Sequence, residues 1–194
     1  MSSKNLKTRE RILSTALKLL EAGRGEGVRM SDIAKKAGIS RQAVYLHFPS
    51  RAELLIAVTR YLDEVKDVDG RLARSRTAAT GIERLNAFID AWGDYIPEIY
   101  GVARALMAMQ ETDKEAEKAW ADRLRAVHQG CAAAVEALAL DGSLTPEHSV
   151  EEATDLLWTL LSVRNWEQLT RDCGWPQEKY IAKMQILARQ TLVK

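Results

Sequence analysis

Cysteine and histidine are scarce in this sequence, which limits the chemistry that the chain can carry out. Its 194 residues include two cysteines, Cys131 and Cys173, and three histidines. Two cysteines do not make the disulfide framework of a small secreted domain, and no Cys-x-x-Cys or His-x-x-x-His spacing offers a metal clip. We therefore expect neither a metal site nor a cofactor.

Long uncharged stretches are also missing. No apolar run approaches the roughly 18 residues that a membrane-spanning helix needs. No apolar run at the N-terminus resembles a signal peptide. Hydrophobic residues still make up 46% of the chain, which is enough for a core. These properties predict a soluble, cytoplasmic protein with no membrane partner.

Strand-like alternation of apolar and polar residues is absent from residue 82 onward, and apolar residues recur at helical spacing instead. We therefore expect an all-α chain. Pro97 should end a helix because proline disrupts helix interiors, and Thr112 with Glu115 should cap the next long one. The polar segment 69–81 should be a loop. Outside residues 28–50, the predicted helices before the C-terminal pair are 7–22, 51–67, 82–96, 99–107 and 112–140.

Charge is unevenly distributed along the chain. Residues 1–60 carry 12 Lys and Arg against 5 Asp and Glu, a net charge of +7, whereas the remainder carries 16 against 22, a net charge of −6. A phosphate-binding head on a body that does not bind DNA would have this asymmetry. Charge alone does not decide between that interpretation and a chance clustering of solvated side chains.

One short stretch, residues 28–54, has the signals of two helices joined by a tight turn. Ser31 is expected to cap the first helix, and Gly38 suits the left-handed position at its end. Ser40 should cap a second helix over 41–48, and Pro49 should end it. Ser50 and Glu53 form a capping box that restarts the chain as a helix, so the pattern is that of a helix-turn-helix.

The second helix of this stretch has a distinct inner and outer face. Val44 and Phe48 are four residues apart and should point inward, against Ile33, Ala37 and Ile39. The outward positions are then Arg41, Gln42, Ala43, Tyr45 and His47. A short exposed helix with this chemistry fits the major groove of DNA, which admits one helix.

The segment SDIAKKAGISRQAVYLHFPSRAEL resembles the DNA-binding signature of the tetracycline-repressor (TetR) family of transcription regulators. The resemblance rests on the Ile-Ala pair, the Ala-Gly-Ile-Ser turn, the Val-Tyr-Leu-His-Phe helix and the Arg-Ala-Glu-Leu entry to the next helix. It implies a three-helix DNA-binding head, residues 1–50, on a larger helical ligand-binding and dimerisation body, residues 51–194. It also implies a ligand-responsive repressor that binds a palindromic operator in double-stranded DNA as a homodimer.

Roles for the recognition helix follow from side-chain chemistry and from the resemblance. Arg41 can pair with guanine, Gln42 with adenine, and the Ala43 methyl can meet a thymine methyl. The resemblance implies phosphate contacts for Tyr45 and His47, and for Arg51 at the start of the next helix. The full predicted DNA-binding set is Met30, Ser31, Ser40, Arg41, Gln42, Ala43, Tyr45, His47 and Arg51.

The C-terminal part is predicted to form the dimer. Ser149 and Glu152 make a capping box, and the run over 156–163 is apolar nearly all round, so that a second subunit should cover it. The last two helices resemble in layout the pair that forms the TetR-like dimer interface. The predicted interface residues are Leu156, Trp158, Leu161, Trp166, Tyr180, Met184 and Leu187.

The body is expected to bind a small apolar or aromatic effector between its central helices, by resemblance. The predicted ligand-binding residues are Trp92, Tyr95, Met107, Trp120, His128 and Trp158. Aromatic and methionine residues at helical spacing also serve as plain core, so each has a packing interpretation beside the binding one.

Two alternatives stay open at this point. The body could bind a protein partner instead of a small molecule. His128 and Cys131 are three residues apart in a helix, so a thiol–imidazole pair of a small enzyme is conceivable. No third orienting group or oxyanion element accompanies that pair, and we expect no enzyme.

Overall fold

The computed structural model describes residues 3–22 and 28–194, which pack as two compact units. The first unit is Met1–Lys66 with Ile99–Leu124, and the second is Asp67–Glu98 with Arg125–Lys194. Long helices α6 (Gly81–Met109) and α7 (Lys114–Leu140) contribute to both units. The predicted boundary at residue 50 concerns function, and the packing units do not test it.

The described residues are helical, apart from turns and one isolated antiparallel bridge between Leu144 and Val193, which confirms the all-α prediction. No helix within residues 3–22 and 28–194 is long and apolar enough to cross a bilayer. The remaining elements are α1 (Ser3–Ala22), α2 (Met30–Ala37), α3 (Arg41–His47), α4 (Arg51–Val65), α5 (Val68–Arg76), α8 (Val150–Leu160), α9 (Val163–Glu167), the π-helix η1 (Gln168–Asp172) and α10 (Gln177–Leu192).

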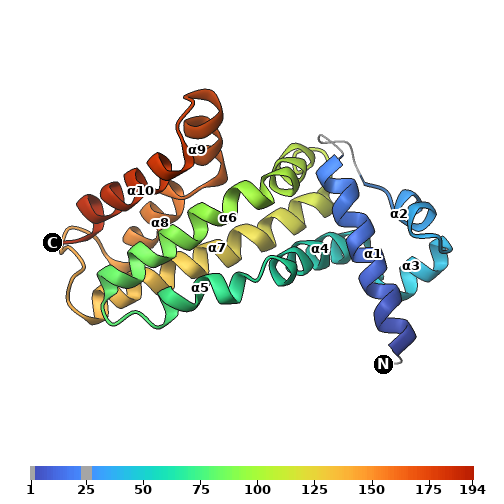
Figure 1. Cartoon of the computed structure of the whole chain (residues 1–194), viewed down its shortest axis with the longest axis horizontal. Helices are drawn as coiled ribbons and strands as arrows, with labels where there is room; N and C mark the ends of the chain where they lie inside the picture. The colour runs from blue at the N-terminus through green and yellow to red at the C-terminus, as the bar shows by residue number, and fades with distance from the viewer. Residues whose placement is uncertain (1–2, 23–27) are drawn as a thin grey trace. The chain divides into compact units, whose positions relative to one another are not determined.

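In the first unit, α1 packs against α2 and α4, and α2 packs against α3 (Figure 1). Their contacts bury apolar side chains completely, and burial of such surface is the main favourable term in folding. Fully buried members of this core are Ile12, Leu20, Ile33, Val44, Leu54 and Leu55.

The local signals of the helix-turn-helix are found where the sequence predicts them, with two exceptions. Gly38 has φ +67° and ends α2, the Ser40 hydroxyl accepts from the Ala43 N–H, and the Ser50 hydroxyl accepts from the Glu53 N–H. The first exception is the predicted capping box of Ser50 and Glu53, of which only this Ser50 half is formed. The second is Ser31. α2 begins at Met30, after Arg29, and no side chain caps it, so the prediction that Ser31 caps this helix is wrong.

Pro97 does not end a helix, contrary to the prediction of separate helices over 82–96 and 99–107. α6 runs through Pro97 without a break and is 29 residues long as a whole. Proline lacks the N–H that would donate to the carbonyl four residues back, which here belongs to Gly93. The side-chain Nε2 of Gln177 on α10 donates to that carbonyl instead, at 2.7 Å. A contact from a distant helix therefore satisfies the group that proline leaves without a helical donor.

The segment 69–81 is not a loop either, because α5 occupies most of it. Asp67 caps α5 by accepting from the Gly70 N–H. Polar contacts then attach α5 to α6. Arg71 pairs with Glu98 at 2.6 Å, Arg74 pairs with Asp90 at 3.3 Å, and the Ser75 hydroxyl donates to the Arg84 carbonyl. Since a helix held this way needs few apolar residues, apolar periodicity does not reveal it.

The apolar run over 156–163 is not one helix. α8 ends at Leu160, and Ser162 caps α9 by accepting from the Asn165 N–H. The capping box of Ser149 and Glu152 is present as predicted. Thr112 does not cap α7 as predicted, since the Asp113 carboxylate accepts from the N–H groups of Glu115 and Ala116 and takes that place.

We predict that Pro97 and Gln177 are energetically coupled. Gln177→Ala should cost about 1–3 kcal/mol of unfolding free energy, because it leaves the buried Gly93 carbonyl unpaired. In a Pro97→Ala background the new backbone N–H supplies that carbonyl, so the cost of Gln177→Ala should be smaller. Urea unfolding of the two single variants and the double variant measures this coupling. If the effects of the two substitutions on the unfolding free energy were strictly additive, the coupling would be contradicted. Gln177→Ala also removes the hydrogen bond from the Trp166 Nε1, but it does so in both backgrounds, so this loss cancels in the double-mutant cycle.

Candidate DNA-binding interface

The recognition helix α3 is held by its inner side and exposed on its outer side. Val44 and Phe48 are buried, with exposed fractions of 0% and 3%. Arg41, Gln42 and Tyr45 are exposed. Helical residues four apart share a face, so Arg41 and Tyr45 form one row and Gln42 begins a second. The packing therefore leaves polar side chains, as predicted, on the side of α3 that does not pack.

Arg41 and Tyr45 contact each other on this exposed face. The Arg41 Nη2 donates to the Tyr45 hydroxyl at 3.3 Å, and the guanidinium carbon lies 5.5 Å from the centre of the tyrosine ring. Stacking on an aromatic ring restricts a guanidinium without consuming its other donors. Arg41 is thus partly preorganised at the N-terminal end of α3.

The other predicted DNA-binding residues of α2 and α3 differ in exposure. Ser31 is exposed near the start of α2, whereas the Met30 side chain is buried in the head. Ala43 and His47 are partly exposed on α3. Ser40 is exposed, and its hydroxyl caps α3.

Sequence reasoning missed one apolar and several basic side chains on these helices. Leu46 is 86% exposed and lies one turn after Gln42, in the second row of the α3 face. Arg29, Lys35 and Lys36 are exposed before and at the end of α2. Basic residues beside a helix-turn-helix were a usable signal, since such proteins contact phosphates with Lys and Arg.

Arg51 differs from the exposed arginine of α3 because its side chain is only 13% exposed. Its Nε donates to the Val28 carbonyl and its Nη1 to the Asp113 carboxylate, both at 2.5 Å. Burial raises the pKa of Asp113, but hydrogen bonds from Arg51 and from the Ala116 and Glu115 N–H groups outweigh it, so the net pKa lies below its usual range. The Asp113 carboxyl is therefore ionised at neutral pH.

The predicted ligand-binding residues fall into both units. Met107 and Trp120 are buried side chains of the first unit, and the other four belong to the second. Trp92 and Tyr95 meet edge to face with ring centres 6.2 Å apart, and the Trp92 Nε1 donates to the Leu161 carbonyl at 2.7 Å. His128 and Trp158 form a second edge-to-face pair, 5.4 Å apart.

His128 does not form the thiol–imidazole pair that its spacing from Cys131 makes conceivable. Its Nε2 lies 3.0 Å from the Asp155 carboxylate on α8. Cys131 is fully buried, and burial raises the pKa of its thiol to about 12, which keeps it protonated. Among the residues that the structure describes, no three His, Cys, Asp or Glu side chains gather in a way that could hold a metal ion.

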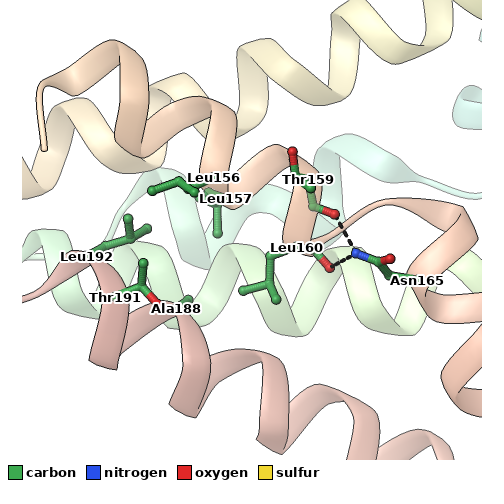
Figure 2. A pocket seen from close by; sticks show the side chains of 8 residues that line it. All are labelled: Leu156, Leu157, Thr159, Leu160, Asn165, Ala188, Thr191 and Leu192. Carbon is green, nitrogen blue, oxygen red and sulfur yellow. Dashed lines mark hydrogen bonds between the residues drawn. The ribbon is translucent and has the colours of Figure 1, made fainter.

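The predicted dimer residues divide by burial. Leu161, Trp166, Tyr180 and Met184 are covered by their own chain, Trp158 is partly covered, and Leu156 and Leu187 are 42% and 41% exposed. Leu156 lines a groove of about 240 Å³ between α8 and α10. Figure 2 shows apolar side chains of both helices around it, and at one end Asn165 donates to the Thr159 and Leu160 carbonyls.

Comparison with known proteins places a family domain on this head. The domain described as bacterial regulatory proteins, tetR family, matches residues 12–58, which contain α2, α3 and the turn between them. The nucleoid occlusion factor SlmA of Marinomonas sp. is 33% identical over 64 residues, which are 33% of this chain and 32% of SlmA. The HTH-type transcriptional regulator EthR of Mycobacterium tuberculosis is 27% identical over 154 residues, which are 75% of this chain and 69% of EthR.

A solved structure extends the comparison to nearly the whole chain. A protein from Saccharomonospora viridis, crystallised in complex with choline, superposes with a TM-score of 0.74 at 20% identity. The superposition covers 97% of this chain and 98% of that one. At this identity the likeness concerns the fold. With the family's domain lying on the helix-turn-helix described above, the chain carries the DNA-binding domain of the tetR family of bacterial regulatory proteins over residues 12–58.

Proposed function

We propose that this protein is a ligand-responsive repressor that binds a palindromic operator as a homodimer and acts in the cytoplasm. The observation that carries the proposal is the exposed face of α3, whose polar side chains stand on a helix fixed by buried Val44 and Phe48. A helix of this size fits the major groove, where base edges identify the sequence. Repression is the usual direction in the family that the sequence resembles.

Within this proposal, α3 supplies both sequence reading and backbone contacts. Arg41 pairs with guanine O6 and N7, Gln42 with adenine, and the Ala43 methyl meets a thymine methyl. Tyr45 and His47 contact phosphates, which position the head without reading sequence. Arg51 is left out of this set because its guanidinium is engaged inside the protein.

Arg41→Ala should relax the sequence preference of the protein. A bidentate arginine–guanine contact contributes about 1–3 kcal/mol of discrimination, so the ratio of operator to random-duplex affinity should fall by about tenfold or more. Arg104→Ala is the matched control, since Arg104 is an exposed arginine of α6 and its loss removes the same charge. The operator is first obtained by selection from random duplex DNA, and fluorescence titrations then give both affinities.

The outcomes of that experiment are distinct. Two similar, inverted half-sites in the selected sequences support a dimer on a palindrome, because half-site spacing follows the two-fold symmetry of the protein. Failure to enrich any sequence contradicts sequence-specific binding. An Arg41→Ala protein that keeps its full operator preference contradicts the role given to Arg41 alone.

The homodimer is proposed to form through α8 and α10. Exposed leucines lie on both helices, and the groove between them is lined mainly by Leu156, Leu160, Ala188 and Leu192. Apolar side chains left in water on adjacent helices are typical of an interaction surface. Two heads joined in this way could occupy successive half-sites.

Leu156→Lys should weaken the dimer by about tenfold or more, which corresponds to about 1.4 kcal/mol. The lysine places a charge in an apolar contact, and the fold should tolerate it because Leu156 is already 42% exposed. Leu140→Lys is the control, since Leu140 is 89% exposed at the end of α7. Light scattering over a concentration series measures the mass. A wild-type protein that stays monomeric at micromolar concentration would refute the dimer.

The effector is proposed to be a small apolar or aromatic molecule bound by the body. The choline complex of the Saccharomonospora viridis protein supports a small-molecule site in a chain of this fold. Aromatic side chains are available, since Trp92, Tyr95 and Trp158 all lie in the second unit. Ligand binding releases DNA only if the ligand prefers the form that binds DNA poorly. A bound ligand that leaves operator affinity unchanged would contradict this part.

One observation favours a second candidate, in which the body binds a protein partner. SlmA, which is 33% identical to this chain over 64 residues, is named a nucleoid occlusion factor and not a transcription regulator, so a similar stretch also occurs in a protein with another role. We expect no enzymatic activity in either case, since the buried thiol of Cys131 is protonated and His128 faces Asp155.

A further inference from the structure

We propose that Arg51 is a positioning residue that fixes the helix-turn-helix through its ion pair with Asp113, and that it does not bind DNA phosphate. The inference rests on the proposed DNA binding. It departs from the expectation that the first residue of α4 contacts the DNA backbone. The contacts of the guanidinium group, all within the first unit, lead to it.

Each nitrogen of the Arg51 guanidinium already has a partner. Nε donates to the Val28 carbonyl, Nη1 to the Asp113 carboxylate with the Glu115 carboxylate at 3.8 Å, and Nη2 lies 3.8 Å from the Met109 sulfur. Turning this group toward a phosphate would take the Arg51 donors away from the Val28 carbonyl and from the Oδ2 atom of Asp113. Groups deprived of a partner in a partly buried site are costly.

The position of these partners explains what the contacts do. Val28 directly precedes α2, and Arg51 is the first residue of α4, so the bond between them joins the two ends of the segment that contains α2 and α3. Asp113 accepts from the same guanidinium, so that Arg51 connects Val28 with Asp113. Its carboxylate is itself fixed, because it accepts from the N–H groups of Glu115 and Ala116 at the start of α7.

Other contacts attach α4 to α7 along its length. The Glu115 carboxylate accepts from the Ala52 N–H at 3.3 Å beside the Arg51 site. Nearer the end of α4, Arg60 pairs with Asp122, and Asp63 pairs with Arg123. Of these contacts between α4 and α7, the Arg51–Asp113 pair is the one whose arginine also bonds to Val28, just before α2. It therefore sets the placement of the recognition helix relative to α7.

Asp113→Asn separates the positioning role from the phosphate role by the sign of its effect. If Arg51 were a phosphate ligand that Asp113 holds back, the variant would free the guanidinium. DNA binding would then tighten, and the slope of log affinity against log salt would steepen by about one unit. If Arg51 positions the helix-turn-helix, the variant weakens operator binding although it removes a negative charge. The salt slope then stays unchanged.

The test measures operator binding by the full-length protein over a range of salt concentrations, with the selected duplex as probe. We expect Asp113→Asn to lose about tenfold or more in operator affinity, with an unchanged salt slope. Glu117→Gln removes the same charge from an exposed position in the first turn of α7 and should change affinity less than twofold. Circular dichroism at the titration temperature checks that each variant is folded.

Arg51→Lys provides an independent measurement if Asp113→Asn fails to fold. A lysine keeps the positive charge for a phosphate, but its single ammonium cannot reproduce the planar fork that joins Val28 and Asp113. The positioning role predicts a loss of operator affinity with this variant as well. Tighter or unchanged binding by either folded variant would overturn the inference. A wild-type protein that binds no duplex would instead refute the proposed function.

Discussion

Presentation of the recognition helix depends on burying Val44 and Phe48 within the head. A seven-residue helix has little stability of its own, so tertiary packing must supply it. The same burial determines which side chains remain outside, because the spacing of an α-helix turns Gln42 and Tyr45 away from Val44. Arg41, at the N-terminal end of α3, is exposed as well. Core packing and the chemistry available for DNA binding are therefore two consequences of one arrangement.

The helix-turn-helix could be predicted because its determinants are local in the sequence. The left-handed turn at Gly38, the caps at Ser40 and Ser50 and the inward spacing of Val44 and Phe48 each involve residues within a few positions of one another. A single sequence displays such determinants directly. The outer face of α3 followed from them, although the exposed Leu46 and the basic residues around α2 were not singled out.

Features that depend on distant partners could not be predicted. α5 is held by pairs such as Arg71 with Glu98. Where α6 continues through Pro97, the Gly93 carbonyl accepts from the side chain of Gln177, which lies 84 residues away in the chain. The same limit applies to the site. The contact of Arg51 with Asp113 joins residues far apart in the sequence, and no local pattern connects them.

The missing backbone hydrogen bond at Pro97 has a mechanical consequence for α6. Proline is one of the recognised causes of a sharp bend in a helix, and here the side chain of Gln177 takes the place of the missing backbone donor. The resistance of α6 to bending at Pro97 therefore rests on a side chain of α10 that belongs to the same compact unit.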